Sequence, residues 1–387
     1  MHLPNYHDGS LVNLMSSLLH AFGAKSEYAP LPLLPPSELA DTTNVVLLVL
    51  DGFGYEFLQR QEPNSLFHKH LKGKITSVFP STTASCVTTF HTGLAPQQHA
   101  VTGWFMFLKE VGSIVTTLLF RPRCCPASLR GEKGAVRPDM LYGTNDIARQ
   151  INRKSCSVYH EKIVKAEYNK AINSYPKHLP FVTFLGCLEQ IRRKIVSDRG
   201  KKYIFAYWDS IDSLSHHYGT TSREVIYHYY ELEEQLKALI RELQGTDTTL
   251  IITADHGLID TEASTTIRVE QHPELRETLT MPLCGEARAP FCYVRPSKAA
   301  QFERYVQQHF SGICDLYSYE ELIHKSWFGL FEPDLRLFDR IGDYVMVMRE
   351  NYVLDDSLLG EECKNYIGRH GGLSKEEMFV PLIVIHT

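Results

Sequence analysis

Residues 47–58 read LLVLDGFGYEFL, so a carboxylate follows directly after an unbroken apolar run. The run begins at Val45 and ends at Leu50. A short all-apolar stretch that ends near glycine is typical of an interior strand of a parallel sheet. Ligands of open α/β sheets gather just beyond the carboxyl ends of such strands. Asp51 is therefore either a functional group or the cap of the following helix.

The same arrangement recurs along the chain, because four more apolar stretches end beside polar groups. They are KITSVFP (74–80), YIFAYW (203–208), TLIITA (249–254) and VPLIVI (380–385). Between them lie helical patterns, the clearest over 221–243, where Thr221 and Glu224 indicate a capping box and Gly245 a stop. Strands that alternate with helices predict an α/β sandwich around a mostly parallel central sheet flanked by helices.

Two composition changes suggest how the chain is divided. The proline-rich stretch PLPLLPPSELADTT (30–43) predicts a boundary, so residues 1–43 are expected to form an N-terminal helical arm and its approach to the sheet. Residues 286–345 break the strand–helix rhythm and predict a small inserted α+β unit, lid-like over the site. The catalytic α/β domain would then comprise 44–285 and 346–387.

Composition excludes several classes of protein. The formal charge of −5 and the absence of a long basic run give no support for binding polymeric nucleic acid or a membrane surface. The N-terminus lacks a classical signal peptide, and no apolar run approaches the roughly 20 residues of a membrane helix. Nine scattered cysteines without a CxxC pair favour reduced thiols. We therefore expect a soluble, cytoplasmic protein; protein partners stay open.

Aspartate and histidine gather after the predicted strands, and these residue types suit Zn²⁺ or Mn²⁺. Asp212 and His216 are four residues apart and share one face if the segment is helical. Asp255 and His256 follow another strand, and His370 lies in GRHGG. Each motif alone is a turn or a loop as readily as a ligand, but their recurrence after separate strands favours a metal centre.

Five blocks, in this order and spacing, resemble the metal-binding segments of the alkaline phosphatase superfamily, above all its type I phosphodiesterase and nucleotide pyrophosphatase branch. The resemblance spans about residues 44–386. The blocks are VLLVLDGFG (46–54), FPSTTASCVTTFHTGLAPQQHAVTGW (79–104), DSLSHHYG (212–219), TADHG (253–257) and HGGLSKEEMFVPLI (370–383).

The resemblance implies two zinc ions, with Mn²⁺ as the alternative metal. One would be held by Asp212, His216 and His370. The other would be held by Asp51, Asp255 and His256, with Thr83 touching it as the nucleophile. In the family the nucleophile precedes the glycine of a TG pair by ten residues, which selects Thr83 over Thr82. A threonine hydroxyl needs such activation, because it is a poor nucleophile at neutral pH.

The resemblance is incomplete on the substrate side. Related nucleotide pyrophosphatases carry an aromatic residue directly after the nucleophile and an asparagine three residues after it, where this chain has Ala84 and Cys86. Candidate substrate-binding residues are Cys86, Trp104 and Arg288. A structural thiol is the alternative for Cys86, core packing for Trp104, and a salt bridge for Arg288.

The leading hypothesis is a two-zinc phosphodiesterase or nucleotide pyrophosphatase that acts on a small, nucleotide-like phosphorylated substrate through a threonyl-phosphate intermediate. One alternative is a phosphomonoesterase or phosphonate hydrolase of the same superfamily. Another is a catalytically silent interaction module, whose signature would be lost ligands. The sequence does not identify the leaving group of the substrate, because loops and the 286–345 segment determine the shape of the pocket.

Overall fold

Strand β1 (Asn44–Leu50) lies inside a seven-stranded sheet in the computed structural model, which describes residues 1–387 except 130–135, 143–145, 198 and 362–364. The strand order is β2 (Leu71–Thr76), β18 (Phe379–His386), β9 (Thr248–Thr253), β1, β8 (Lys202–Trp208), β6 (Lys154–His160) and β7 (His178–Phe181). Strands β9, β1, β8, β6 and β7 are parallel, whereas β18 is antiparallel to both of its neighbours. The predicted mostly parallel sheet is confirmed.

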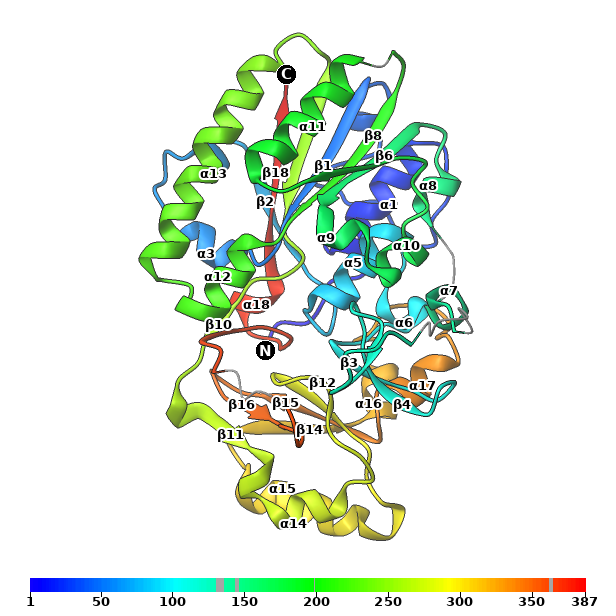
Figure 1. Cartoon of the computed structure of the whole chain (residues 1–387), viewed down its shortest axis with the longest axis vertical. Coiled ribbons are helices and arrows are strands. Elements are labelled where there is room, and N and C mark those ends of the chain that lie inside the picture. The colour runs from blue at the N-terminus through cyan, green and yellow to red at the C-terminus, as the bar shows by residue number, and fades with distance from the viewer. Residues whose placement is uncertain (130–135, 143–145, 198, 362–364) are drawn as a thin grey trace.

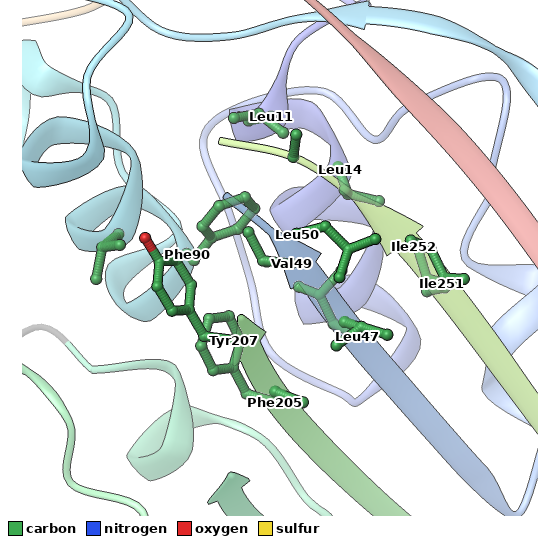
Figure 2. Close-up of a cluster of buried hydrophobic side chains, with 14 of the residues drawn as sticks. Leu11, Leu14, Leu47, Val49, Leu50, Phe90, Phe205, Tyr207, Ile251 and Ile252 are labelled. Atoms are coloured by element: carbon green, nitrogen blue, oxygen red, sulfur yellow. The ribbon is translucent and has the colours of Figure 1, made fainter. Parts of the chain in front are cut away.

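Every residue of β1 is buried, which explains why its sequence is apolar on both faces. Helices α13 (Arg223–Glu242) and α1 (Leu11–Ala21) lie on opposite sides of the sheet (Figure 1). Figure 2 shows Leu47, Val49 and Leu50 among side chains from α1, α5 (Thr83–Thr92), β8 and β9. Leu11 and Leu14 belong to this same core, so the predicted N-terminal arm contributes to the packing of the sheet.

Helix α13 matches the predicted helix closely, but its first turn differs. Ser222, and not Thr221, is the N-cap, and its hydroxyl accepts a hydrogen bond from the Val225 amide. Ser222 has an extended backbone, as an N-cap requires. The apolar face from Val225 to Leu239 is buried as the helical spacing predicted.

A second seven-stranded sheet is antiparallel and forms the lower part of the molecule in Figure 1. Its order is β14 (Cys314–Ser318), β15 (Tyr344–Met348), β13 (Ala289–Cys292), β12 (Cys284–Glu286), β3 (Phe105–Leu108), β4 (Ser113–Thr116) and β5 (Arg121–Pro122). The 286–345 segment thus shares its sheet with strands from 105–122, which the sequence placed in the catalytic domain. These strands are too short to show a period-2 pattern.

The remaining elements connect the two sheets or cover them. Two small ladders pair β10 (Ile259–Asp260) with β17 (Gly368–Arg369) and β11 (Thr266–Arg268) with β16 (Val353–Asp355). The longer helices are α11 (Phe184–Ser197), α12 (Ser210–Tyr218) and α15 (Ala299–His309). The shorter helices are α2 (Ser37–Ala40), α3 (Tyr55–Gln59), α4 (Leu66–Lys69), α6 (Pro96–His99), α7 (Pro138–Tyr142), α8 (Ile147–Gln150), α9 (Glu161–Val164), α10 (Glu167–Ile172), α14 (Pro273–Thr278), α16 (Tyr319–His324), α17 (Arg336–Arg340) and α18 (Lys375–Met378).

Candidate metal centre and active site

Three carboxylates follow the carboxyl ends of β1, β8 and β9, which are neighbours in the sheet. Asp51 comes directly after β1, Asp212 lies in the first turn of α12 after β8, and Asp255 lies just beyond β9. Gly52 allows Asp51 and Asp212 to approach each other. Its φ is +74°, and a Cβ at this position would lie 2.9 Å from the Asp212 Cα. An alanine at this position would be strained and would collide with α12.

One cluster of side chains surrounds Nε2 of His256. Asp51 Oδ1 and Asp255 Oδ2 each lie 3.5 Å from this nitrogen, and Thr83 Oγ1 lies 3.1 Å from it. The structure thus brings together all four residues assigned to one predicted metal. They arrive from the ends of β1 and β9 and from the start of α5.

A second cluster surrounds Oδ1 of Asp212. His216 Nε2 lies 3.3 Å from this oxygen and His370 Nε2 lies 3.9 Å from it. The rings of His370 and His256 are stacked with centroids 3.8 Å apart, so the two clusters adjoin. Asp212 also lies close enough to Asp51 and His256 to join the first cluster.

The three histidines are oriented in the same way. Each Nδ1 lies within hydrogen-bond distance of a backbone carbonyl oxygen, which must accept: Gly368 for His216, Gly257 for His256 and Ser81 for His370. We infer that each Nδ1 carries the ring proton. Each Nε2 then presents a lone pair to the centre of its cluster, which is the arrangement of metal-binding histidines.

The buried oxygens of these clusters indicate that a cation belongs between them. Asp51 Oδ1, Asp212 Oδ1 and Asp255 Oδ2 are buried and accept no hydrogen bond from the described residues. A buried carboxylate oxygen without a partner is costly, and a divalent cation removes that cost. Aspartate oxygens with imidazole nitrogens form a donor set that Zn²⁺ and Mn²⁺ accept. The residues therefore fit the metals that the sequence predicted.

The carboxylates also perturb one another. Burial and the neighbouring charges of Asp255 and Asp212 raise the pKa of Asp51 well above its usual range. Burial raises the pKa of Asp255. Burial also opposes ionisation of Asp212, but the adjacent His216, when it is protonated, outweighs burial and lowers the pKa of Asp212. Like charges held this close need an added positive charge to ionise together.

The two adjacent threonines have different surroundings. Thr83 is the first residue of α5, and its hydroxyl contacts His256 Nε2. Thr82 is buried, and its hydroxyl donates to Glu286 Oε1 at 2.5 Å. Only the Thr83 hydroxyl of this pair lies in the metal-ligand cluster. Thr83 also begins a ten-residue helix, whose N-terminus favours an anion.

A cavity of about 610 Å³ opens beside the clusters and extends over the second sheet. Thr83, Asp212, His216 and His370 line one part of it. Trp104 lines it as well, and its backbone amide donates to Glu286 Oε1 at 2.7 Å. Trp104 therefore lies on the wall of the pocket, and its contact with a substrate stays a prediction.

Two predicted substrate-binding residues lie elsewhere. Arg288 is 1% exposed, and its guanidinium forms a buried ion pair with Glu377 at 2.9 Å. Cys86 lies on α5 and is fully buried, and its thiol lies 3.2 Å from both the Asp255 carbonyl and the Ser77 hydroxyl. Burial also raises the pKa of Cys86, which keeps the thiol neutral. Both predictions are corrected: Arg288 is held by a salt bridge and Cys86 is a structural thiol.

A comparison with protein families identifies the chain. The model described as type I phosphodiesterase / nucleotide pyrophosphatase matches residues 45–373. The chain belongs to this family. It is therefore a hydrolase of phosphoric ester bonds, of a metal-dependent kind. The resemblance seen in the sequence is confirmed. No curated protein matches the sequence of this phosphodiesterase family member.

Solved structures share the fold of this type I phosphodiesterase family member. Murine ectonucleotide pyrophosphatase / phosphodiesterase 5 superposes with a TM-score of 0.67 at 18% identity, covering 88% of this chain and 87% of that chain. An inactive threonine-to-alanine variant of the murine protein in complex with AMP superposes with a TM-score of 0.65 at 19% identity, covering 88% of this chain and 87% of that chain. Phosphonoacetate hydrolase from Sinorhizobium meliloti 1021, in complex with phosphonoformate, gives 0.60 at 19% identity, with coverages of 89% and 90%.

Sequence reasoning missed two groups that support the site of this family member. The Tyr207 hydroxyl donates to Asp51 Oδ2, and Glu286 joins Thr82 to Trp104 across the pocket. Tyr207 pairs with Val49 in the β1–β8 register and lies one residue before Trp208, where its apolar run ends. A tyrosine inside an apolar strand is expected to be a packing residue, so no local pattern in the sequence marks Tyr207 as functional.

None of the described helices is long and apolar enough to cross a membrane.

Proposed function

We propose that this protein is a two-zinc phosphodiesterase or nucleotide pyrophosphatase that works through a phosphorylated threonine. The observation that carries the proposal is the convergence of Thr83 and six Asp and His side chains into two adjoining clusters. One zinc would be held by Asp51, Asp255 and His256, and the other by Asp212, His216 and His370. When bound, the ions would neutralise phosphoryl oxygens and favour the ionised forms of a hydroxyl and of water.

Thr83 would be the nucleophile. Its oxygen forms a bond to phosphorus while the bond between phosphorus and the leaving oxygen breaks, and the leaving group departs as an alcohol or a phosphate. The proton lost from the Thr83 hydroxyl passes to solvent. The phosphorus on Thr83 still carries the other substituent of the substrate, so the intermediate is a phosphodiester of threonine. Water then attacks this phosphorus, the bond to the Thr83 oxygen breaks, and a phosphomonoester is released as the hydroxyl is restored. The position of Thr83 at the start of α5 supports this role, because backbone N–H groups there attract phosphoryl oxygens.

A small, nucleotide-like substrate is part of the proposal. The murine relative in complex with AMP supports a nucleotide, whereas the phosphonoacetate hydrolase supports the phosphonate alternative. A catalytically silent interaction module is disfavoured because every implied ligand is present. The eight described cysteines are free thiols, which supports the cytoplasmic location that we also propose.

One assay distinguishes these hypotheses. Zinc-loaded protein is offered bis-p-nitrophenyl phosphate, p-nitrophenyl phosphate, a nucleotide sugar, ATP and phosphonoacetate. We expect the diester or anhydride to be hydrolysed faster than the monoester. Faster turnover of the monoester or of the phosphonate would replace the proposal with the corresponding alternative. No turnover of any substrate would favour the interaction module.

Acid quenching during turnover tests the covalent step. Mass spectrometry is expected to find on Thr83 the phosphoryl group of the substrate with its retained substituent, and Thr83→Ala should remove this label. Thr82→Ala is the matched control, because it deletes the same hydroxyl one residue away, where the partner is Glu286. Labelling that persists in Thr83→Ala would refute the threonyl intermediate.

A further inference from the structure

Arg121 is a cation in the pocket that has no partner among the described residues. It lies on β5, lines the cavity and is half-buried. Its side chain makes no hydrogen bond or ion pair with any residue that the structure describes. A guanidinium carries five N–H donors and a permanent charge, so such a group in a cavity is available to an anion.

The other charged groups along this wall already have partners. Arg123, two residues further along the chain, pairs with Glu361 at 2.8 Å, and its guanidinium lies 4.1 Å from the centre of the Phe105 ring. Arg369 pairs with Asp355 at 2.7 Å. The two charges of each pair neutralise each other, and the pairs hold the wall in place. Arg121, in contrast, forms no ion pair with any described residue.

The register of the second sheet connects Arg121 to the catalytic end of the pocket. Gly285 pairs with Phe105, Phe105 with Thr116, and Thr116 with Arg121. Directly paired residues point to the same face of a sheet, and all four of these line the cavity. Adjacent strands lie about 4.8 Å apart, so the row spans about 14 Å from Gly285 to Arg121. Gly285 is next to Glu286, which contacts Thr82 beside the nucleophile.

We infer that Arg121 is a specificity-determining residue that binds a second anionic group of the substrate, a carboxylate or a phosphate, remote from the scissile phosphorus. The body of the substrate lies along this row, beside the Phe105 side chain that lines the cavity. This inference rests on the proposed function and deepens it. The preferred substrates are phosphodiesters or anhydrides whose substituent ends in an anion.

Two symmetric diesters test the inference: bis(4-carboxyphenyl) phosphate and bis(4-carbamoylphenyl) phosphate. They have nearly the same shape and differ in the charge at the far end of each ring. Because both substituents are identical, either one can occupy the pocket. The ratio of the two kcat/KM values measures the preference for the distal anion.

We expect the zinc-loaded wild type to prefer the carboxylate, and Arg121→Gln to lose roughly 10- to 100-fold of that preference, as for a hydrogen bond to a charged group. Arg121→Lys should retain part of it. Lys109→Gln is the matched control: it removes the same charge from the neighbouring β3–β4 turn, where Lys109 is 68% exposed and pairs with Asp339. Its preference should equal that of the wild type. Circular dichroism confirms that each variant is folded.

Calorimetric binding of 4-carboxyphenyl phosphate and 4-carbamoylphenyl phosphate gives a second readout, and Arg121→Gln should weaken the first selectively. If both diesters are hydrolysed and Arg121→Gln leaves the preference unchanged, the inference is wrong and the proposed function stands. If no form hydrolyses either diester, the proposed function fails and the inference fails with it. An equal loss of preference in Lys109→Gln would also overturn the inference, because it would show a general charge effect.

Discussion

Replacing Tyr207 by phenylalanine should weaken zinc binding without disturbing the fold. The Tyr207 hydroxyl donates to Asp51 Oδ2, while Asp51 Oδ1 faces His256 and is available to a cation. A metal binds the ionised carboxylate, and the hydrogen bond from Tyr207 favours that ionised form. Tyr207→Phe removes one oxygen atom and leaves the packing of the ring intact.

The magnitude follows from the single bond that is lost. A hydrogen bond to a charged group contributes about 1.5–3 kcal/mol. Part of this free energy also stabilises the metal-free protein, where burial and the charges of Asp255 and Asp212 raise the pKa of Asp51. That part does not contribute to zinc affinity. The remainder corresponds to about 10- to 100-fold in zinc affinity, or about 1.4–2.7 kcal/mol, as is usual for a group that supports a metal ligand.

Competition with a chromogenic chelator measures the zinc affinity directly. Tyr203→Phe is the matched control, because Tyr203 lies on the same strand, is fully buried, and has a hydroxyl without a hydrogen-bond partner among the described residues. We expect its zinc affinity to equal that of the wild type. If Tyr207→Phe and Tyr203→Phe bind zinc equally well, Asp51 does not serve as a ligand in the way we describe.

Three further predictions concern stability. First, burial lowers the pKa of His91 to about 3; the unfolded chain therefore binds the extra proton between about pH 6.5 and 3, and stability falls by about 1.4 kcal/mol per pH unit as pH drops through that window. Urea unfolding at several pH values should show a shallower acid slope for His91→Gln. Second, Glu377→Gln leaves Arg288 buried without its counter-charge, and should lower the free energy of unfolding by about 3–5 kcal/mol in urea titrations, whereas an unchanged midpoint would contradict the buried pair. Third, chelation should lower the Tm, and zinc at a hundred times its Kd should restore about 2.7 kcal/mol, a gain that must depend on zinc concentration.

The parallel sheet and the candidate ligands were predictable from sequence for one physical reason. A parallel strand buried on both faces must be apolar throughout, so a polar residue at its end stands out. Asp51, Asp212 and Asp255 carry this signal, and neighbouring parallel strands bring their carboxyl ends to one edge of the sheet. Local patterns therefore predicted a long-range cluster.

The pocket wall carried no such signal. Arg121 lies on a strand of two residues, and Phe105 meets Gly285 at a single register position. Pairings this short leave no period in the sequence, and they join positions far apart along the chain. For Arg288 the sequence pattern was misleading. An arginine at the start of the predicted insertion is a reasonable phosphate ligand, but its buried partner Glu377 is 89 residues away in the sequence and is identified only by the structure.

The position of β18 between β9 and β2 has a consequence for synthesis. The Met378 carbonyl accepts from the Ser77 amide at 2.7 Å, and the Glu377 carbonyl accepts from the Gly257 amide at 2.9 Å. The segments that lead to the nucleophile and follow His256 are thus held by α18, the short helix directly before β18. A nascent chain on the ribosome cannot close its sheet or assemble its catalytic centre before residues 379–386 emerge. Until then β2 and β9 present open edges, and such edges invite association with other chains. Activity should therefore appear only after residues 379–386 have left the ribosome, and chaperone capture should be strongest shortly before that point.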